Sequence, residues 1–191
     1  MKEFLESYTQ DAIRTESRID KVTLNAELLS SVLTIAKASG NLLDQIKKHA
    51  FYGKEYNEEN MKQDFAHIVA GLDGFKNSFD VMNEEEDLEI DPRVFHAIVG
   101  IATESTELLE ALDFTGKEMD RVNILEESFD VDWYQFILMD AIDGDLRTVW
   151  DTGIDKLKAR YPDNFDSDSA INRDLDAERE ILDKLDDDKS K

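Results

Sequence analysis

Apolar residues recur three and four positions apart over several long stretches of the chain, the spacing of one helix face. The clearest stretch covers residues 23–49, and Phe51-Tyr52-Gly53 follows it as the expected break. The charge run that ends in Asp91-Pro92 is the best internal boundary, because proline suits the first turn of a helix. The pattern therefore predicts an all-α protein, with further helices over residues 1–22, 57–81, 92–112, 118–142, 146–161 and 166–185.

The two halves of this helix series resemble each other. Residues 35–43 share their pattern with residues 101–109, an offset of 66, and residues 51–60 share theirs with 114–123, an offset of 63. Repeated hairpins are a natural way to build a pseudo-symmetric bundle, although any two helix hairpins can share leucine and glycine at similar places. We predict a helical bundle of two repeated antiparallel helix hairpins plus a C-terminal helical arm, divided as residues 1–85, 86–145 and 146–191.

Composition narrows the classes of function. The 191 residues include 45 acidic and 22 basic side chains, a formal charge of −23, which disfavours binding to the nucleic-acid duplex. The absence of cysteine excludes disulfides and thiolate metal sites. No apolar run is long enough for a membrane span, and the first residues lack a signal-peptide pattern, so we expect a cytoplasmic protein without a membrane partner. A well-solvated surface is the simplest reason for the charge.

Four acids form a split motif that points to a metal site. Glu104 and Glu107 are three residues apart, as are Glu127 and Asp130, so each pair lies on one helix face. If the hairpin reverses near Gly116, Glu107 and Glu127 both lie roughly 14–16 Å from the turn. Four carboxylates at one level need a cation or protonation. The alternative is a solvated acidic face, and spacing alone does not exclude it in so acidic a chain.

The predicted inner stripe of the fourth long helix runs beside two of these acids. It comprises Leu125, Phe129, Trp133 and Phe136. Acids at the edge of a core are costly unless they coordinate something. At the corresponding positions the first hairpin has a different set, so we expect the acidic site in the second hairpin alone. That set is Ala38, Asn41, Asp64 and His67.

The motif Glu104-Ser-Thr-Glu107 with Glu127-Ser-Phe-Asp130 resembles the ExxE…ExxD motif of the MazG-like all-α nucleotide pyrophosphohydrolases. Further stretches that look like the single-domain phage and bacterial members extend the resemblance over nearly the whole chain. They are residues 12–16, 46–54, 156–165 and 171–179. Two positions depart from the family pattern: Asp132 replaces an apolar residue, and Gly153 stands where an asparagine is common.

The resemblance implies Mg²⁺-dependent hydrolysis of a nucleoside triphosphate, NTP or dNTP, to the monophosphate and pyrophosphate, with Mn²⁺ as a substitute ion. Mg²⁺ prefers oxygen ligands and is commonly held by carboxylates together with substrate phosphates. The family-matched metal ligands are Glu104, Glu107, Glu127 and Asp130. One of the three glutamates would also act as the catalytic base toward water.

The triphosphate also needs positive charge. Lys156 and Arg160 match basic positions of the family, although ordinary ion pairing with nearby acids is the alternative. Further substrate-binding candidates are Lys117, Lys48, Lys54 and Tyr52. Because the family usually assembles its sites between subunits, both a homodimer and a monomer completed by the internal repeat remain open. The competing function is a non-catalytic helical interaction protein with a degenerate site.

Overall fold

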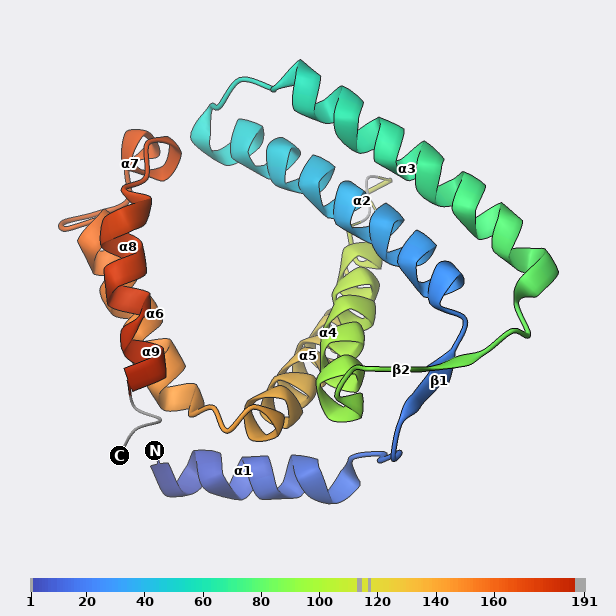
Figure 1. Cartoon of the computed structure of the whole chain (residues 1–191). Helices are drawn as coiled ribbons and strands as arrows, with labels where there is room; N and C mark the ends of the chain where they lie inside the picture. The colour runs from blue at the N-terminus through green and yellow to red at the C-terminus, as the bar shows by residue number, and fades with distance from the viewer. Residues whose placement is uncertain (1, 113–114, 117, 188–191) are drawn as a thin grey trace. The chain divides into compact units, whose positions relative to one another are not determined.

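The computed structural model describes residues 2–112, 115–116 and 118–187, and most of them lie in helices. The all-α prediction is confirmed (Figure 1). Within these residues, no helix combines the length and apolar composition that a membrane span requires. The elements are α1 (Lys2–Thr15), β1 (Val22–Leu24), α2 (Ala26–Tyr52), α3 (Glu58–Ser78), the 3₁₀ turn η1 (Phe79–Val81), β2 (Glu86–Leu88), α4 (Pro92–Glu110), α5 (Arg121–Ala141), α6 (Leu146–Arg160), α7 (Ser167–Ile171), α8 (Leu175–Leu182) and α9 (Lys184–Asp187).

The chain forms two compact units, each built from segments that are distant in sequence. The α4–α5 unit comprises Met1–Val22 and Glu89–Thr152, and the α2–α3 unit comprises Thr23–Leu88 and Gly153–Lys191. Each predicted hairpin therefore lies in a different unit. The predicted division into residues 1–85, 86–145 and 146–191 follows the sequence repeat and remains a prediction.

Helices α2 and α3 form an antiparallel hairpin. α2 ends at Gly53, which adopts the left-handed conformation (φ 66°) that glycine accommodates without steric cost. Along the hairpin, the Asn41 amide donates to Asp64 at 2.8 Å, and further from the turn Ile35 packs against Gly71. From the first pair to the second, the position moves back along α2 and forward along α3 by similar numbers of residues. This is the register of an antiparallel hairpin.

The far end of this hairpin is closed by Asn25 and by a strand pair that the sequence pattern did not predict. Asn25 is buried, caps α2 through the Leu28 N–H, and donates from its amide to the carbonyls of Val81 and Glu84. Beside it β1 and β2 pair. Each strand has three residues, too few for alternation of apolar and polar positions to stand out. The predicted long helix therefore begins at Ala26 rather than at residue 23.

Helices α4 and α5 form the second hairpin. Asp91 caps α4 by accepting from two backbone N–H groups, and Pro92 occupies its first turn, as predicted. Asp120 caps α5 in the same way. The helices approach closely where Gly100 faces the ring of Tyr134, since a Cβ at Gly100 would lie 2.2 Å from that ring.

The N-terminal helix α1 packs against α5. Leu5, Ala12, Phe136 and Leu146 form a buried cluster, and the Trp133 indole N–H donates to the Thr15 hydroxyl at 3.0 Å. An ion-pair network lies beside this contact, directly after the C-terminal end of α1. There Arg93 of α4 binds Glu16 and Asp140, each at 2.7 Å. This network raises the pKa of Arg93, first through the hydrogen bond to Glu16.

The predicted inner stripe of α5 is only half right. Phe136 is buried and Trp133 packs against the cluster beneath α1, but Leu125 and Phe129 are more than half exposed. The reason is geometric, because α1 contacts the C-terminal part of α5 through Trp133 and Phe136. Leu125 lies two or more turns away, beyond that cover.

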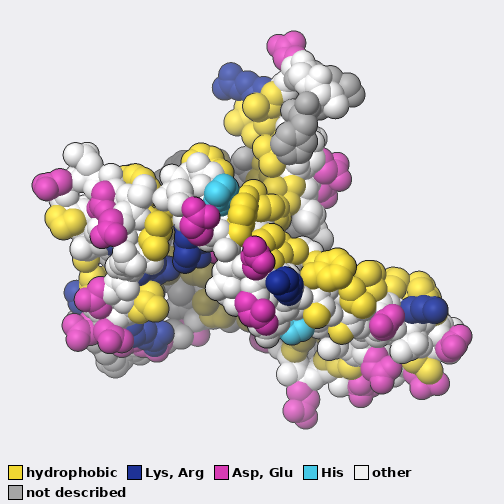
Figure 2. Space-filling view, turned by 90° about the horizontal axis from the view of Figure 1, so that it is seen from above, with side chains coloured by type: hydrophobic (Ala, Val, Ile, Leu, Met, Phe, Trp, Pro, Cys, Tyr) yellow, Lys and Arg dark blue, Asp and Glu magenta, His cyan; other side chains and the backbone are white. Residues whose placement is uncertain are grey.

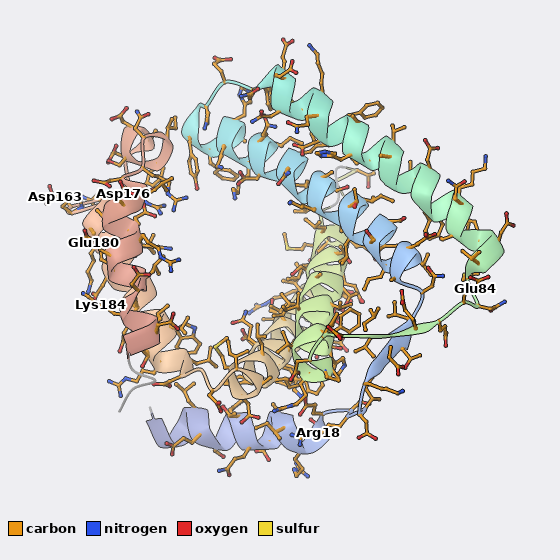
Figure 3. All side chains as sticks on the ribbon, in the orientation of Figure 1. Arg18, Glu84, Asp163, Asp176, Glu180 and Lys184 are labelled. Carbon is orange, nitrogen blue, oxygen red and sulfur yellow. The ribbon has the colours of Figure 1, made fainter. Side chains whose placement is uncertain are left out.

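The predicted helix over residues 166–185 is interrupted and forms α7, α8 and α9. Asp174 provides the reason, since its side chain accepts from the Ala177 N–H and starts a new helix at Leu175. Asp166 caps α7 in the same manner. Asp176, Glu180 and Lys184 lie four residues apart along α8 and α9 and are exposed (Figure 3).

The acidic charge is distributed over the surface. On the face shown in Figure 2, acidic side chains alternate with hydrophobic ones and are not gathered in one block. In the part of the chain that is described, lysines form ion pairs mainly with exposed neighbours on the same helix, as Lys62 does with Glu58. Exposed pairs of this kind contribute little to stability.

Candidate metal centre

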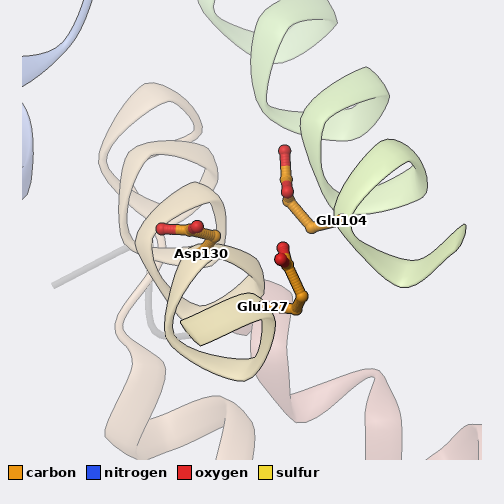
Figure 4. Close-up of side chains that lie close together, drawn as sticks. All are labelled: Glu104, Glu127 and Asp130. Atoms are coloured by element: carbon orange, nitrogen blue, oxygen red, sulfur yellow. The ribbon is translucent and has the colours of Figure 1, made fainter. Parts of the chain in front are cut away.

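Three of the four predicted metal ligands lie together between the helices of the second hairpin. Glu104 comes from α4, and Glu127 and Asp130 come from α5 (Figure 4). One carboxylate oxygen from each lies within 4.8 Å of the others. All three donors are oxygen atoms, which fits a hard divalent cation such as Mg²⁺ or Mn²⁺.

Helix geometry explains why these side chains meet. Glu127 and Asp130 are three residues apart, so both lie on the face of α5 that turns toward α4. Glu104 lies about one turn along α4 from Gly100, where the two helices approach closely through Tyr134. The close approach at Gly100 therefore brings the carboxylates of the two helices to one level.

Glu127 is the buried member of the cluster, with 6% of its surface exposed. Burial raises the pKa of its carboxyl group, and the negative charges of Glu107, Glu104 and Asp130 raise it further. A hydrogen bond with Glu104 acts in the same direction. The cluster thus holds a carboxylate whose charged form is unfavourable until positive charge arrives.

Glu107 stands apart from the other three predicted ligands. It is exposed on α4 and is not a member of the group whose oxygens lie within 4.8 Å. Among the neighbouring charges, that of Glu107 nevertheless has the largest effect in raising the pKa of Glu127. Glu107 is therefore close enough to act on the cluster, and its predicted role as a ligand stays a prediction.

Two neighbours of the cluster, Thr103 and Tyr134, were not predicted as site residues. The Thr103 hydroxyl donates to Glu104 at 3.2 Å. Burial, followed by the charges of Glu104 and Asp130, raises the pKa of the Tyr134 phenol. Its place beside the apolar stripe made Tyr134 look like an ordinary core residue, and Thr103 carries no signal beyond its position next to Glu104.

A cavity of about 250 Å³ adjoins the cluster within the α4–α5 unit. Thr103 and Tyr134 line it, together with the apolar side chains of Phe95 and Val99. His96 also lines this cavity, and its ring lies edge-on to Tyr134 with centroids 5.3 Å apart. The His96 Nδ1 atom is buried and has no hydrogen-bond partner among the described residues. The cavity is thus mainly apolar, with a few polar atoms.

No family model, curated protein or solved structure matches the chain. The resemblance to the MazG-like group therefore remains one of motif and spacing.

The predicted basic residues of α6 belong to the α2–α3 unit. The Nε and Nη2 groups of Arg160 each donate to the Glu178 carboxylate at 2.7 Å, and Arg173 binds the same carboxylate. These hydrogen bonds lower the pKa of Glu178 to about 2, and the bond from Arg173 has the largest effect. Arg160 is thus engaged in an ion pair with the buried Glu178, whereas Lys156 is half-buried and has no ion-pair partner among the described residues. Their roles in substrate binding stay predictions.

The other residues predicted to bind substrate lie in different places. Lys48 and Lys54 line a cavity of about 720 Å³ in the first hairpin, and Lys48 pairs there with Asp44. Tyr52 packs on Phe165 with ring centroids 5.5 Å apart. Lys117 lies outside the described residues.

Proposed function

We propose that the protein is a Mg²⁺-dependent nucleoside triphosphate pyrophosphohydrolase that converts an NTP or dNTP to the monophosphate and pyrophosphate. The supporting observation is the meeting of Glu104, Glu127 and Asp130 from two helices, with Glu127 buried among like charges. Carboxylates in this arrangement gain stability when a cation binds. The motif resemblance supplies the reaction.

In this proposal the acidic residues have different roles. Glu104, Glu127 and Asp130 would hold the metal, which when bound would supply positive charge to the triphosphate and lower the pKa of water. Glu107, the exposed neighbour, is placed to accept the proton of the attacking water. Water adds across the bond between the α- and β-phosphoryl groups, so one product gains its oxygen and the bridging oxygen leaves with pyrophosphate.

The neighbouring cavity supports a nucleotide as the ligand. Its apolar wall of Phe95 and Val99 suits a flat base, and its polar groups are those that orient ligands in mainly apolar pockets. The buried His96 Nδ1 atom offers a hydrogen-bonding position that no described residue uses. We place the base of the substrate in this cavity.

The decisive experiment is pyrophosphate release from a panel of NTPs and dNTPs with Mg²⁺. We expect Glu127→Gln to reduce turnover by at least about 100-fold, because it removes a buried ligand charge. Glu126→Gln is the matched control, since Glu126 is the exposed neighbour on the same helix, and it should keep nearly full activity.

The alternative is a non-catalytic interaction protein whose acids bind only a cation. It predicts Mg²⁺ or Mn²⁺ binding that Glu127→Gln weakens, without pyrophosphate release from any nucleotide. That result would overturn the enzymatic proposal. A homodimer and a cytoplasmic location also remain predictions, which sedimentation and cell fractionation would test.

A further inference from the structure

The first hairpin keeps a cavity at the level where the second hairpin has its acids. Its volume is about 720 Å³, and residues of α2, α3 and the turn between them line it. Its lining includes all four positions that correspond to the acidic motif, occupied by Ala38, Asn41, Asp64 and His67. The volume is in the range of small-molecule sites.

The substitutions at these positions remove the metal chemistry. Only Asp64 retains a carboxylate, and it is buried with 6% of its surface exposed. The Asn41 amide, at the position of Glu107, donates to it at 2.8 Å. Across the described residues, the Glu104 cluster is the group whose acidic and histidine side chains bring three ligand atoms together. In the first hairpin a hydrogen bond thus takes the place of carboxylate repulsion.

Positive charge lines the same cavity. Lys37 and Lys54 line it, and neither ammonium has an ion-pair partner in the part of the chain that is described. Lys48 also lines it but pairs with Asp44, which binds Lys47 at 2.7 Å as well. Those two lysines lower the pKa of Asp44. The charge of Asp44 is therefore already neutralised within the protein.

Three lysines and three acids line the cavity. Asp44 is paired with lysines, and Asp64 accepts a hydrogen bond from the Asn41 amide but keeps its charge. Lys37 and Lys54 are therefore the cations of the lining that have no ion-pair partner among the described residues. Amide side chains line the cavity beside these charges, including Asn60 and Gln63. In a chain of net charge −23, this is a setting for an anion with a polar body, because lysine ammonium groups bind phosphate oxygens.

We propose that this cavity is a second, metal-independent site that binds a small phosphate monoester. The phosphate would contact Lys37 and Lys54, and the amides would bind the polar remainder of the molecule. The site does not depend on the proposed hydrolysis, because it uses none of the residues of the acidic cluster.

The test uses the full chain labelled with ¹⁵N, in EDTA, titrated with inorganic phosphate and with AMP as a nucleoside monophosphate. We expect saturable shifts of amide signals from residues 34–67, with dissociation constants below about 10 mM. The double variant Lys37→Gln, Lys54→Gln should weaken binding at least about tenfold. The matched control Lys62→Gln removes an exposed lysine of α3 that does not line the cavity, and it should change binding less than about twofold.

The spectra of the variants also report whether the hairpin still folds. Saturable shifts by either ligand that the lysine double variant loses while its spectrum stays folded would support the proposal. Absence of saturable shifts by both ligands, or equal binding by the folded double variant, would overturn it. Binding that appears only with Mg²⁺ and disappears in Glu127→Gln would also overturn it, by assigning the ligand to the acidic cluster.

Discussion

At the scale of single residues, Glu127 links protonation to metal binding. Burial and three neighbouring acids raise its pKa, whereas a metal ligand must be ionised. A cation and a proton therefore compete for the same carboxylate. The same argument explains how the cluster can exist without a cation, since sharing a proton relieves part of the repulsion.

We predict that Mg²⁺ or Mn²⁺ affinity rises with pH through the raised pKa of Glu127 and that binding releases protons. Because the pKa lies above the ordinary carboxyl value, the gain should continue past the pH at which exposed glutamates are ionised, about 4.3. Calorimetry in buffers of different ionisation enthalpy measures the protons released. An affinity independent of pH between about 4 and 7 would contradict the prediction.

The pKa of Glu178, in the α2–α3 unit, is shifted in the opposite direction to that of Glu127. Its folded pKa is lowered to about 2 by Arg173 and Arg160, so it stabilises the folded state above the unfolded pKa of about 4.3. This contribution should fall as the pH decreases from about 5 toward 2.

The variant Glu178→Gln should be destabilised by about 3 kcal/mol at neutral pH, because the largely covered Arg160 loses its counter-charge. It should also lose much of the decline in stability below pH 5 that the parent shows. Urea denaturation at several pH values measures both effects. Glu180→Gln is the control, since Glu180 is exposed on the same helix. Equal acid sensitivity in both variants would count against the ion pair.

At the scale of helices, close contact in both hairpins depends on one glycine facing a large side chain. In the first hairpin Gly71 of α3 faces Ile35 of α2, and in the second Gly100 of α4 faces Tyr134 of α5. The glycine belongs to the second helix of the first hairpin and to the first helix of the second hairpin. In both hairpins it faces a large side chain of the other helix. Each of these four residues lies three or four positions along its helix from the nearest position of the acidic motif or its counterpart.

We predict that Gly71→Ala destabilises the first hairpin by about 1–3 kcal/mol. Its Cβ would lie 2.6 Å from the Ile35 side chain and 3.0 Å from the Ser31 carbonyl oxygen, and the latter belongs to the backbone. Gly40→Ala is the control within the same hairpin, because nothing lies within 4 Å of its Cβ. There alanine should stabilise by up to about 1 kcal/mol through helix propensity. Changes in melting temperature that have the same sign for both variants would refute this prediction.

Helix periodicity predicted the hairpins well because the breaks and caps at Gly53, Asp91 and Asp120 have strong local causes. It predicted the C-terminal arm poorly, since Asp174 can both continue a helix and cap a new one, and only the local fold decides. For the site, spacing brought Glu104, Glu127 and Asp130 together correctly. It did not reveal that Glu178 engages Arg160, because that contact depends on how the interrupted arm folds back.

At the scale of the whole molecule, the net charge of −23 acts against compactness. Most acids are exposed, and exposed ion pairs between neighbours on one helix offset little of their mutual repulsion. Screening by salt reduces repulsion between exposed charges that are farther apart than about 10 Å.

We therefore predict that the melting temperature rises with added NaCl from about 0.01 to 0.5 M. A gain of about 1 kcal/mol corresponds to a shift of roughly 2–4 °C for a chain of this size. Differential scanning calorimetry measures it, and a sucrose series provides the control for effects that do not depend on charge. A fall in melting temperature would mean that ion pairs such as Arg93 with Glu16 outweigh the general repulsion.

The shared register of the two hairpins has a consequence for how many ions one chain can hold. Ala38, Asn41 and His67 are the positions at which the first hairpin lacks an acid of the motif, and Asp64 already supplies one. Replacing these three by Glu, Glu and Asp should create a second acidic centre in the first hairpin. Manganese bound per chain, counted by electron paramagnetic resonance, would then double.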